Sequence, residues 1–243
     1  MEPSPAARFP PCLVALQFLI QQASNHGFYI SLRFLPQGVN DPYEWARTNS
    51  YDFARASHNW TFIQSVVDGL NGIYLDKYDL GNEEIPPSNT WFGAAPGPWN
   101  GAIVIQYASW LWSSFTAKYG TANTFGLSVA CGDDCTQKLA QFPNVYGGNF
   151  PPVFNLHIYG QCAPGTSQTA QQIYLNAWNY LRGRGWGQTW VIGETCYDDY
   201  NTGRLLQPAH QQAGNTVWYL LQFPYPPSAT MPLDYSQYIS TGW

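Results

Sequence analysis

The side chains best suited to chemistry in this sequence are glutamates, of which the chain has only five. Glu83 and Glu84 are adjacent in the segment YDLGNEEIPP, and Glu194 follows the apolar run TWVIG. Two carboxyl groups can cleave a glycosidic bond when one is protonated, the other is ionised and they lie roughly 5 Å apart across the anomeric carbon. Glu83 and Glu84 cannot form such a pair, because neighbours at a strand end point to opposite sides.

The partner of this segment must therefore come from elsewhere in the chain. Glu2 lies in a Pro-rich terminal arm and Glu44 in a long predicted loop, so Glu194 is the remaining glutamate that follows an apolar strand. Two glutamates on different strands, both aimed along a barrel axis, would satisfy the geometry. We predict Glu83 and Glu194 as the catalytic pair.

The residues on either side of Glu83 decide between the two adjacent glutamates. Asn82 comes directly before Glu83 and offers an amide that can bond a sugar 2-hydroxyl. Glu84 is then expected to face the following loop and solvent, as a bystander beside the IPP segment.

Strands and helices alternate along the chain. Strands are predicted at about 28–35, 73–80, 124–130, 153–159, 189–194 and 218–223, and helices at about 12–25, 59–70, 99–120, 135–142, 169–185 and 207–217. A loop containing Pro42 follows the first strand. Because the strand interiors are almost fully apolar, we expect a parallel sheet covered on both faces.

Polar side chains gather at the carboxyl ends of the predicted strands, which carry Asn82, Glu83, Asp133, Asp134, His157, Tyr159, Glu194 and Gln222. Functional residues on that rim are typical of a (β/α) barrel. A nucleotide-binding sheet would show a glycine-rich turn instead, and neither GxGxxG nor GxxxxGK[ST] occurs.

Two of these segments resemble a known family. YDLGNEE looks like the fourth-strand signature of clan A glycoside hydrolases, the retaining TIM-barrel β-glycosidases, in which an Asn-Glu pair ends the strand and the Glu is the general acid/base. WVIGETCYDD is similar to the seventh-strand signature, whose Glu is the nucleophile. The resemblance assigns these roles to Glu83 and Glu194, and it implies double-displacement hydrolysis without a metal or an organic cofactor.

The resemblance also implies that the barrel is incomplete. If YDLGNE is the fourth strand, the first two β/α units have no place in the chain, and residues 1–243 form a single domain with about six strands, numbers 3–8 of the usual eight. Arg33 is the one basic side chain that the early part of the barrel offers. An open barrel exposes two sheet edges, so we expect a homodimer or another device that covers the gap.

Further substrate-binding residues are predicted on the later strands. His157 and Tyr159 alternate onto one face of NLHIYG, and Tyr159 could hydrogen-bond the nucleophile and help to keep it ionised. The aromatic side chains that could stack on a sugar, each equally readable as core, are Trp91, Trp99, Trp218 and Phe223.

The composition favours a carbohydrate partner. Charged residues make up 10% of the chain and aromatic residues 17%, so its polarity rests on amides and hydroxyls, which suit an oligo- or polysaccharide. The net charge of -5 argues against a nucleic-acid partner, and no apolar run is long enough to span a membrane. The alternative function is a catalytically inactive barrel that binds glycans through its aromatic residues.

The remaining signals concern location and covalent modification. Residues 11–20 read as a helix or as the apolar part of a signal peptide; we expect a secreted or extracellular protein, with a cytoplasmic location as the alternative. Asn59 opens the triplet Asn-Trp-Thr, a glycosylation acceptor in a eukaryotic secretory pathway. Five cysteines leave at least one thiol free; Cys131 with Cys135, and Cys162 with Cys196, are candidate pairs.

Overall fold

The computed structural model describes residues 10–70, 73, 77–93, 97–162, 165–186 and 189–195. The predicted helix at 207–217 and the predicted strand at 218–223, with Trp218 and Phe223, lie outside the described residues. Cys196 does too, so its pairing with Cys162 stays a prediction.

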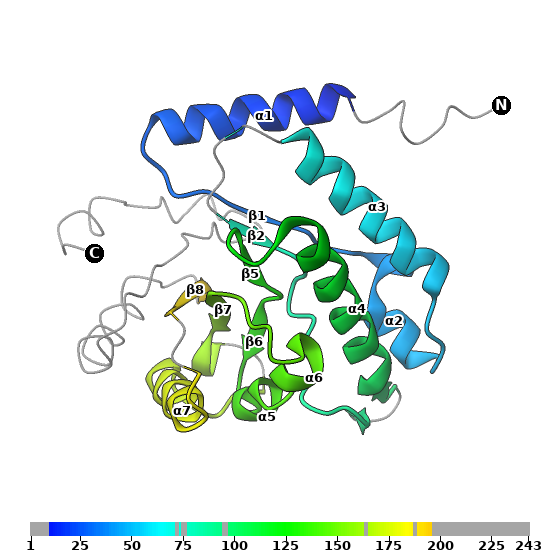
Figure 1. Ribbon diagram of the computed structural model, residues 1–243. Helices are drawn as coiled ribbons and strands as arrows, with labels where there is room; N and C mark the ends of the chain where they lie inside the picture. The colour runs from blue at the N-terminus through cyan, green and yellow to red at the C-terminus, as the bar shows by residue number, and fades with distance from the viewer. Residues whose placement is uncertain are drawn as a thin grey trace.

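The strands form two parallel sheets at the centre of the molecule (Figure 1). The first sheet has the order β1 (Ser31–Arg33), β2 (Lys77–Asp79), β5 (Thr124–Gly126), and the second has the order β6 (Val129–Cys131), β7 (Val153–Ile158), β8 (Thr189–Thr195). Every pairing within the two sheets is parallel. The protein is therefore a mixed α/β protein with parallel sheets, as the alternation of elements predicted.

A bend in one chain segment joins the two sheets. The predicted strand at 124–130 is divided into β5 and β6 because Gly126 adopts a left-handed conformation with φ of 74°. A side chain at this position would also press on Tyr146. Beyond the bend, the Ser128 hydroxyl donates to the Gly81 carbonyl oxygen at 2.9 Å, so the segment stays beside the chain that leaves β2.

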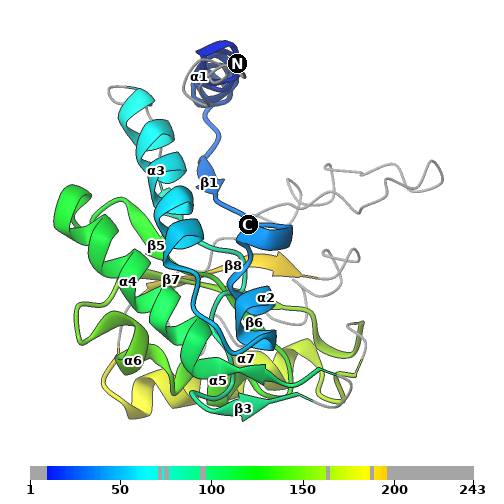
Figure 2. The same ribbon diagram turned by 90° about the vertical axis from the view of Figure 1, so that its right-hand side faces the viewer.

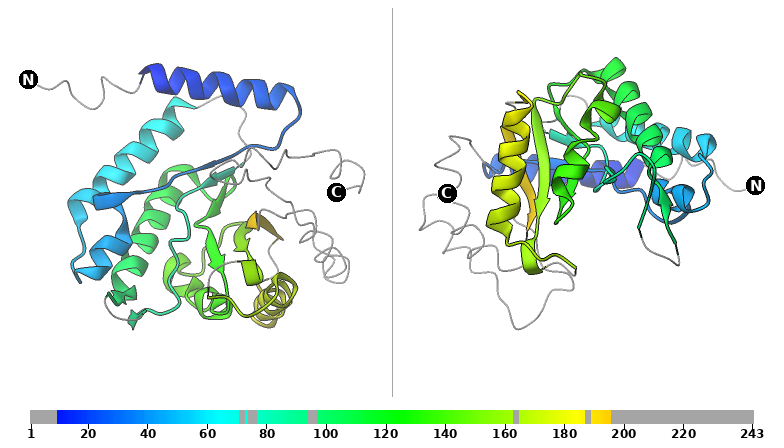
Figure 3. Two further views of the ribbon diagram at one scale, coloured as in Figure 1. Left: turned by 180° about the vertical axis from the view of Figure 1, so that it is seen from behind. Right: turned by 90° about the horizontal axis from the view of Figure 1, so that it is seen from below.

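Helices surround these strands. They are α1 (Pro10–Asn25), α2 (Pro42–Arg47), α3 (Phe53–Gly69), α4 (Gly101–Tyr119), α5 (Cys135–Leu139), α6 (Phe142–Tyr146) and α7 (Ala170–Gly183), with short 3-10 turns η2 (Gly38–Asn40) and η3 (Gly160–Cys162). In Figure 2, α3 and α4 run side by side, and Figure 3 shows α7 on the outer side of β7 and β8. Most of these helices follow the predicted positions, and buried aromatic side chains fill the space beneath them.

Two elements depart from the sequence prediction. The predicted loop around Pro42 contains α2, which Asp41 caps by accepting from the Tyr43 backbone N–H at 2.8 Å, with Pro42 at its first turn. An antiparallel hairpin of β3 (Trp91–Phe92) and β4 (Trp99–Asn100) precedes α4. Both are short, so neither leaves a long periodic pattern in the sequence.

The described strands do not close into a barrel. Within the described part of the chain, β1 pairs only with β2 and β8 only with β7, which agrees with an incomplete barrel. The α1 helix stands at one end of the molecule, where Gln17 donates to the Gly69 carbonyl oxygen at 2.7 Å (Figure 1). Its apolar side chains Val14, Phe18 and Leu19 are each more than 60% exposed.

Two further properties bear on the expectations above. No helix among the described residues is both long and apolar enough to cross a bilayer. The sulfurs of Cys131 and Cys135 form a disulfide, one of the two candidate pairs, and Cys12 is a free, exposed thiol.

Candidate active site

The carboxyl ends of three strands bring the predicted catalytic residues together. Glu83 follows β2, His157 lies near the end of β7, and Glu194 lies near the end of β8. His157 and Glu194 are direct partners in the parallel register of β7 and β8. Gly193 permits this approach, because a side chain there would collide with the Asn155 amide. Segments 111 positions apart in the sequence thus meet at one edge.

His157 lies between the two glutamates and is fully buried. Its Nδ1 atom is 2.9 Å from Oε1 of Glu83 and 3.5 Å from Oε2 of Glu194. Its Nε2 atom is 2.9 Å from Nη2 of Arg33. A guanidinium can only donate, so Nε2 must accept and the ring hydrogen must sit on Nδ1. The Nδ1 side of His157 therefore donates toward the two glutamates.

Glu194 has the environment of an ionised carboxylate. The Tyr159 hydroxyl donates to Oε2 and the Arg33 guanidinium donates to Oε1. Burial by itself raises the pKa of Glu194, but His157, Tyr159 and Arg33 outweigh it, and the pKa lies below its ordinary range. Burial and the neighbouring Glu194 hold the pKa of Tyr159 far above its usual value, so its hydroxyl remains a donor.

Arg33 organises the site to a degree that the sequence did not reveal. Besides His157 and Glu194, it donates to Asp79 Oδ2 at 2.9 Å and to Asn82 Oδ1 at 2.9 Å. The register places Arg33 opposite Asp79 in β1 and β2. The sequence shows a polar residue at the end of each of these two strands. It does not show that Arg33 and Asp79 pair, because their pairing depends on the register of β1 and β2.

Asp79 holds the Arg33 guanidinium in place from inside the protein. It is fully buried, and it also accepts from Asn155 Nδ2 at 2.8 Å and from the Ser128 backbone N–H at 3.1 Å. Burial raises the pKa of Asp79, although Arg33 acts against that rise. Asp79 therefore fixes the guanidinium that contacts the functional residues above it.

Glu83 is held in an unusual backbone conformation. Its φ is 64°, in the left-handed region that non-glycine residues seldom occupy. Its backbone N–H donates to Ser128 Oγ at 3.0 Å, and its carbonyl oxygen accepts from the Tyr43 hydroxyl at 3.1 Å. Its side chain is 32% exposed, so solvent and ligands can reach it. Strain that surrounding contacts hold in place is typical of functional positions.

The prediction for Glu84 is wrong. Glu84 is 2% exposed rather than solvated, and its Oε2 has no hydrogen-bond partner among the described residues. The strand β2 ends at Asp79 and Glu83 adopts a left-handed conformation, so the strand alternation on which the prediction depended does not extend to Glu84. Burial raises the pKa of Glu84 well above its ordinary value, and nearby acidic groups, including Asp41 and Asp79, add to the rise. Burial therefore favours the protonated, neutral form of Glu84.

The catalytic candidates could also be considered as metal ligands. One ligand atom each from Glu83, His157 and Glu194 lie within 4.8 Å of one another. A metal on His157 would require Nδ1 without its hydrogen, whereas the bond from Arg33 to Nε2 keeps that hydrogen in place. Arg33 also donates to Glu194. The donor set suits proton transfer and nucleophilic attack better than it suits a cation.

A polar cavity of about 520 Å³ opens beside Glu83 and Tyr159. The other described residues that line it are Ala130, Cys131, Gly132, Asp133, Asp134, Lys138, Gly165 and Thr166. The cavity therefore joins the edge of the site to the loop after β6, which the Cys131–Cys135 disulfide spans. A cavity of this size can hold a small molecule.

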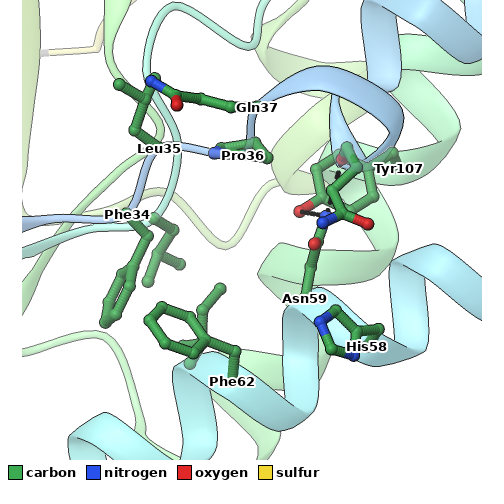
Figure 4. A pocket seen from close by; sticks show the side chains of 11 residues that line it. Phe34, Leu35, Pro36, Gln37, His58, Asn59, Phe62 and Tyr107 are labelled. Carbon is green, nitrogen blue, oxygen red and sulfur yellow. Dashed lines mark hydrogen bonds between the residues drawn. The ribbon is translucent and has the colours of Figure 1, made fainter.

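A second, more apolar pocket of about 370 Å³ lies between α3 and the chain after β1 (Figure 4). Phe34 and Phe62 meet edge to face on its floor, with ring centroids 6.3 Å apart. Asn59, which is 9% exposed, donates from Nδ2 to the Asn40 carbonyl oxygen at 2.9 Å and to the Tyr107 hydroxyl at 3.2 Å. An N-linked glycan would be attached to this same Nδ2 atom, which these two hydrogen bonds already occupy.

The predicted aromatic platform is not assembled by the described residues. Trp91 is 50% exposed on the β3–β4 hairpin and does not line the cavity beside Glu83. Trp99 packs edge to face against Tyr43 with ring centroids 6.4 Å apart, and Tyr43 in turn contacts Glu83. Trp218 and Phe223 lie outside the described residues. Sugar stacking by Trp91, Trp218 or Phe223 stays a prediction.

Comparisons with known proteins identify no family. No family model matches the sequence, and no curated protein matches it. Among solved structures, the chain is similar to a GH5-4 broad specificity endoglucanase from Clostridium longisporum, with a TM-score of 0.47 and 13% sequence identity. The match covers 85% of this chain and 65% of that chain, so this chain spans less than two thirds of the endoglucanase. Function is therefore argued from the site.

Proposed function

We propose that the chain is a retaining glycoside hydrolase that cleaves β-glycosidic bonds in an oligo- or polysaccharide. The observation that carries the proposal is the arrangement of Glu83 and Glu194 around His157, with carboxylate oxygens of the two glutamates within 4.8 Å. Retaining enzymes place their two carboxyl groups about 5 Å apart, whereas inverting enzymes leave more room for a water molecule.

The two glutamates have environments suited to different roles. Glu194 receives hydrogen bonds from Arg33 and Tyr159 that favour its ionised form, so it can attack the anomeric carbon. Glu83 is more exposed and lines a cavity, where it can protonate the departing oxygen. In the second step, Glu83 takes a proton from water, and that water releases the sugar from Glu194.

Other residues position the substrate in this proposal. The Oδ1 atom of Asn82 is committed to Arg33, so its Nδ2 group is the one that can donate to a sugar hydroxyl. His157 donates toward Glu83 and thereby stabilises the carboxylate that remains after proton transfer.

A panel of aryl β-glycosides tests the proposal. We expect hydrolysis with retained configuration, followed by NMR of the first product formed. Glu194→Gln should abolish turnover. Glu44→Gln is the matched control, because Glu44 is an exposed helical glutamate whose side chain is 47% accessible. Inversion at the anomeric carbon, or full activity in Glu194→Gln, would refute the proposal.

The leaving group separates the two roles. Glu83→Gln should slow cleavage of poor leaving groups by about 10²–10⁴-fold, because general acid catalysis is lost. A dinitrophenyl glycoside needs no protonation, so it should still give a fast burst of dinitrophenol followed by slow release of the sugar. A wild type that binds glycans without turnover, and binds them equally well as Glu194→Gln, would support the glycan-binding alternative instead.

A further inference from the structure

The polar cavity beside Glu83 contains charged residues that have no role in the proposed catalytic steps. We propose that it is the site of the leaving group and that its charge selects neutral, hydroxyl-rich leaving groups, such as a sugar residue, over anionic ones. This inference rests on the proposed function, because it takes Glu83 as the acid that protonates the departing oxygen.

The position of the cavity supports this role. Glu83 and Tyr159 line it, and Glu194 is not among its described lining residues. The leaving group must lie within hydrogen-bond reach of the acid and on the side of the anomeric carbon away from the nucleophile. A cavity that contacts the acid but not the nucleophile meets both conditions.

Fixed negative charge dominates the cavity wall. Asp133 accepts from the Ser167 hydroxyl at 2.7 Å and from the backbone N–H groups of Ser167 and Gln168 at 2.9 and 3.0 Å. These bonds lower the pKa of Asp133, so it is ionised at neutral pH. They also tie the loop carrying Gly165 and Thr166 to the loop after β6.

Among the described residues of the wall, the one cation, Lys138, is already engaged. Lys138 Nζ lies 3.2 Å from Asp134 Oδ1 and donates to the Ala130 carbonyl oxygen at 2.8 Å. Apart from Glu83, the proposed acid, the described charged residues of the wall (Asp133, Asp134 and Lys138) leave one net negative charge. A carboxylate or sulfate on the leaving group would meet repulsion, whereas sugar hydroxyls can donate to the aspartates.

The wall is built before any ligand arrives. The Cys131–Cys135 disulfide closes over Gly132, Asp133 and Asp134, and both of its cysteines are 2% exposed. Because covalent and hydrogen-bonded ties fix the carboxylates, binding requires little ordering of the wall.

Saturation-transfer NMR with methyl β-glucoside and methyl β-glucuronide tests the selectivity without turnover. We expect the wild type to bind the neutral glucoside at least about three-fold more strongly, the effect of one unit charge a few ångströms away. Asp134→Asn should reduce the difference in binding between the glucoside and the glucuronide. Thr166→Trp should abolish the saturation-transfer signals of both ligands by filling the cavity. Asp68→Asn is the control, because it removes a carboxylate from an exposed lysine pair elsewhere. Equal or preferred binding of the glucuronide by the wild type, or signals that persist in Thr166→Trp, would overturn the proposal.

Sugar transfer tests the leaving-group role in the active enzyme. By reversal of the first step, an occupant of this cavity can accept the sugar from Glu194. With an aryl glycoside as donor, mass spectrometry should find transfer to the glucoside in preference to the glucuronide, and Thr166→Trp should lose this transfer. Selective binding with no aryl glycoside turnover by the wild type would refute the proposed hydrolase and the leaving-group role together. Turnover without selective binding would refute the cavity assignment alone.

Discussion

His157 donates its Nδ1 hydrogen to Oε1 of Glu83 across 2.9 Å. The direction of this bond is fixed by Arg33, which occupies the opposite side of the ring. Because Nδ1 is also 3.5 Å from Oε2 of Glu194, one hydrogen faces both carboxylates. The ring can therefore shift its bond toward whichever glutamate carries more negative charge during the two proposed steps.

Tyr159→Phe should change the pH dependence of activity. The hydroxyl of Tyr159 lowers the pKa of Glu194, so its removal should raise that pKa. Glu194 must be ionised to attack, and activity is lost as the pH falls through its pKa. The acid limb of the kcat/KM profile should therefore move to higher pH, with a loss of about ten-fold or more at the optimum.

A matched variant separates this effect from a general loss of a tyrosine hydroxyl. Tyr119→Phe removes a hydroxyl that donates to Asp68 at 2.7 Å, outside the proposed site. We expect its profile to match the wild type. An acid limb that stays in place in Tyr159→Phe would show that Tyr159 does not control the ionisation of Glu194.

Glu83→Gly should abolish activity without the usual cost in stability. Glycine adopts the φ of 64° freely, whereas glutamate is strained there. The variant also loses the bond from His157, so we expect a net gain of at most about 1 kcal/mol in the free energy of unfolding, measured by urea denaturation. Glu44→Gly, in the helix α2, should lose about 1 kcal/mol. Equal losses in the two variants would contradict strain at Glu83.

Glu84→Gln should remove a pH dependence of stability. The pKa of Glu84 in the folded protein lies well above its ordinary value of 4.5, so the folded state holds this proton more tightly than the unfolded state. The stabilisation is complete below pH about 4.5 and is lost as the pH rises toward the folded pKa. The wild type should lose on the order of 1 kcal/mol per pH unit in that window.

The amide of Glu84→Gln is neutral at every pH, so the unfolding free energy of this variant should fall less than that of the wild type as the pH rises above about 4.5. Chemical denaturation at a series of pH values measures this slope. Parallel slopes for wild type and Glu84→Gln would mean that Glu84 is ionised in the folded protein.

The chain should self-associate through α1, in line with the dimer expected for an incomplete barrel. Val14, Phe18 and Leu19 are exposed on this helix, and apolar surface of this kind favours association. Light scattering should show a mass that rises with concentration, and Phe18→Glu should reduce it. Val39→Glu, at an equally exposed residue in η2, serves as the control. A monodisperse monomer at all concentrations would exclude the dimer.

The sequence predicted those features that depend on local pattern. Apolar runs located the strands of the two parallel sheets, and carboxylates after two of these strands led to the prediction of Glu83 and Glu194, which lie close together in the structure. The bond between Tyr159 and Glu194 was also expected, because alternation places His157 and Tyr159 on one face and the family resemblance implies a His or Tyr near the nucleophile.

Features that depend on register and backbone conformation were missed. Arg33 meets Asp79 because β1 and β2 align at those positions, and no spacing in the sequence reveals such an alignment. Glu84 is buried because strand alternation does not hold at its position: β2 ends at Asp79, and Glu83 adopts a left-handed conformation. Tyr43 reaches Glu83 from α2, a helix too short to leave a periodic signal.

Asn59 has a practical consequence for producing the protein. Its side chain is buried between α3 and its neighbours, yet it opens a triplet that eukaryotic secretory cells modify. An oligosaccharide attached there during synthesis would prevent α3 from packing against Tyr107 and the turn at Asn40. The choice of expression host, and whether Thr61 is replaced in a secreting one, should therefore decide how much folded protein is recovered.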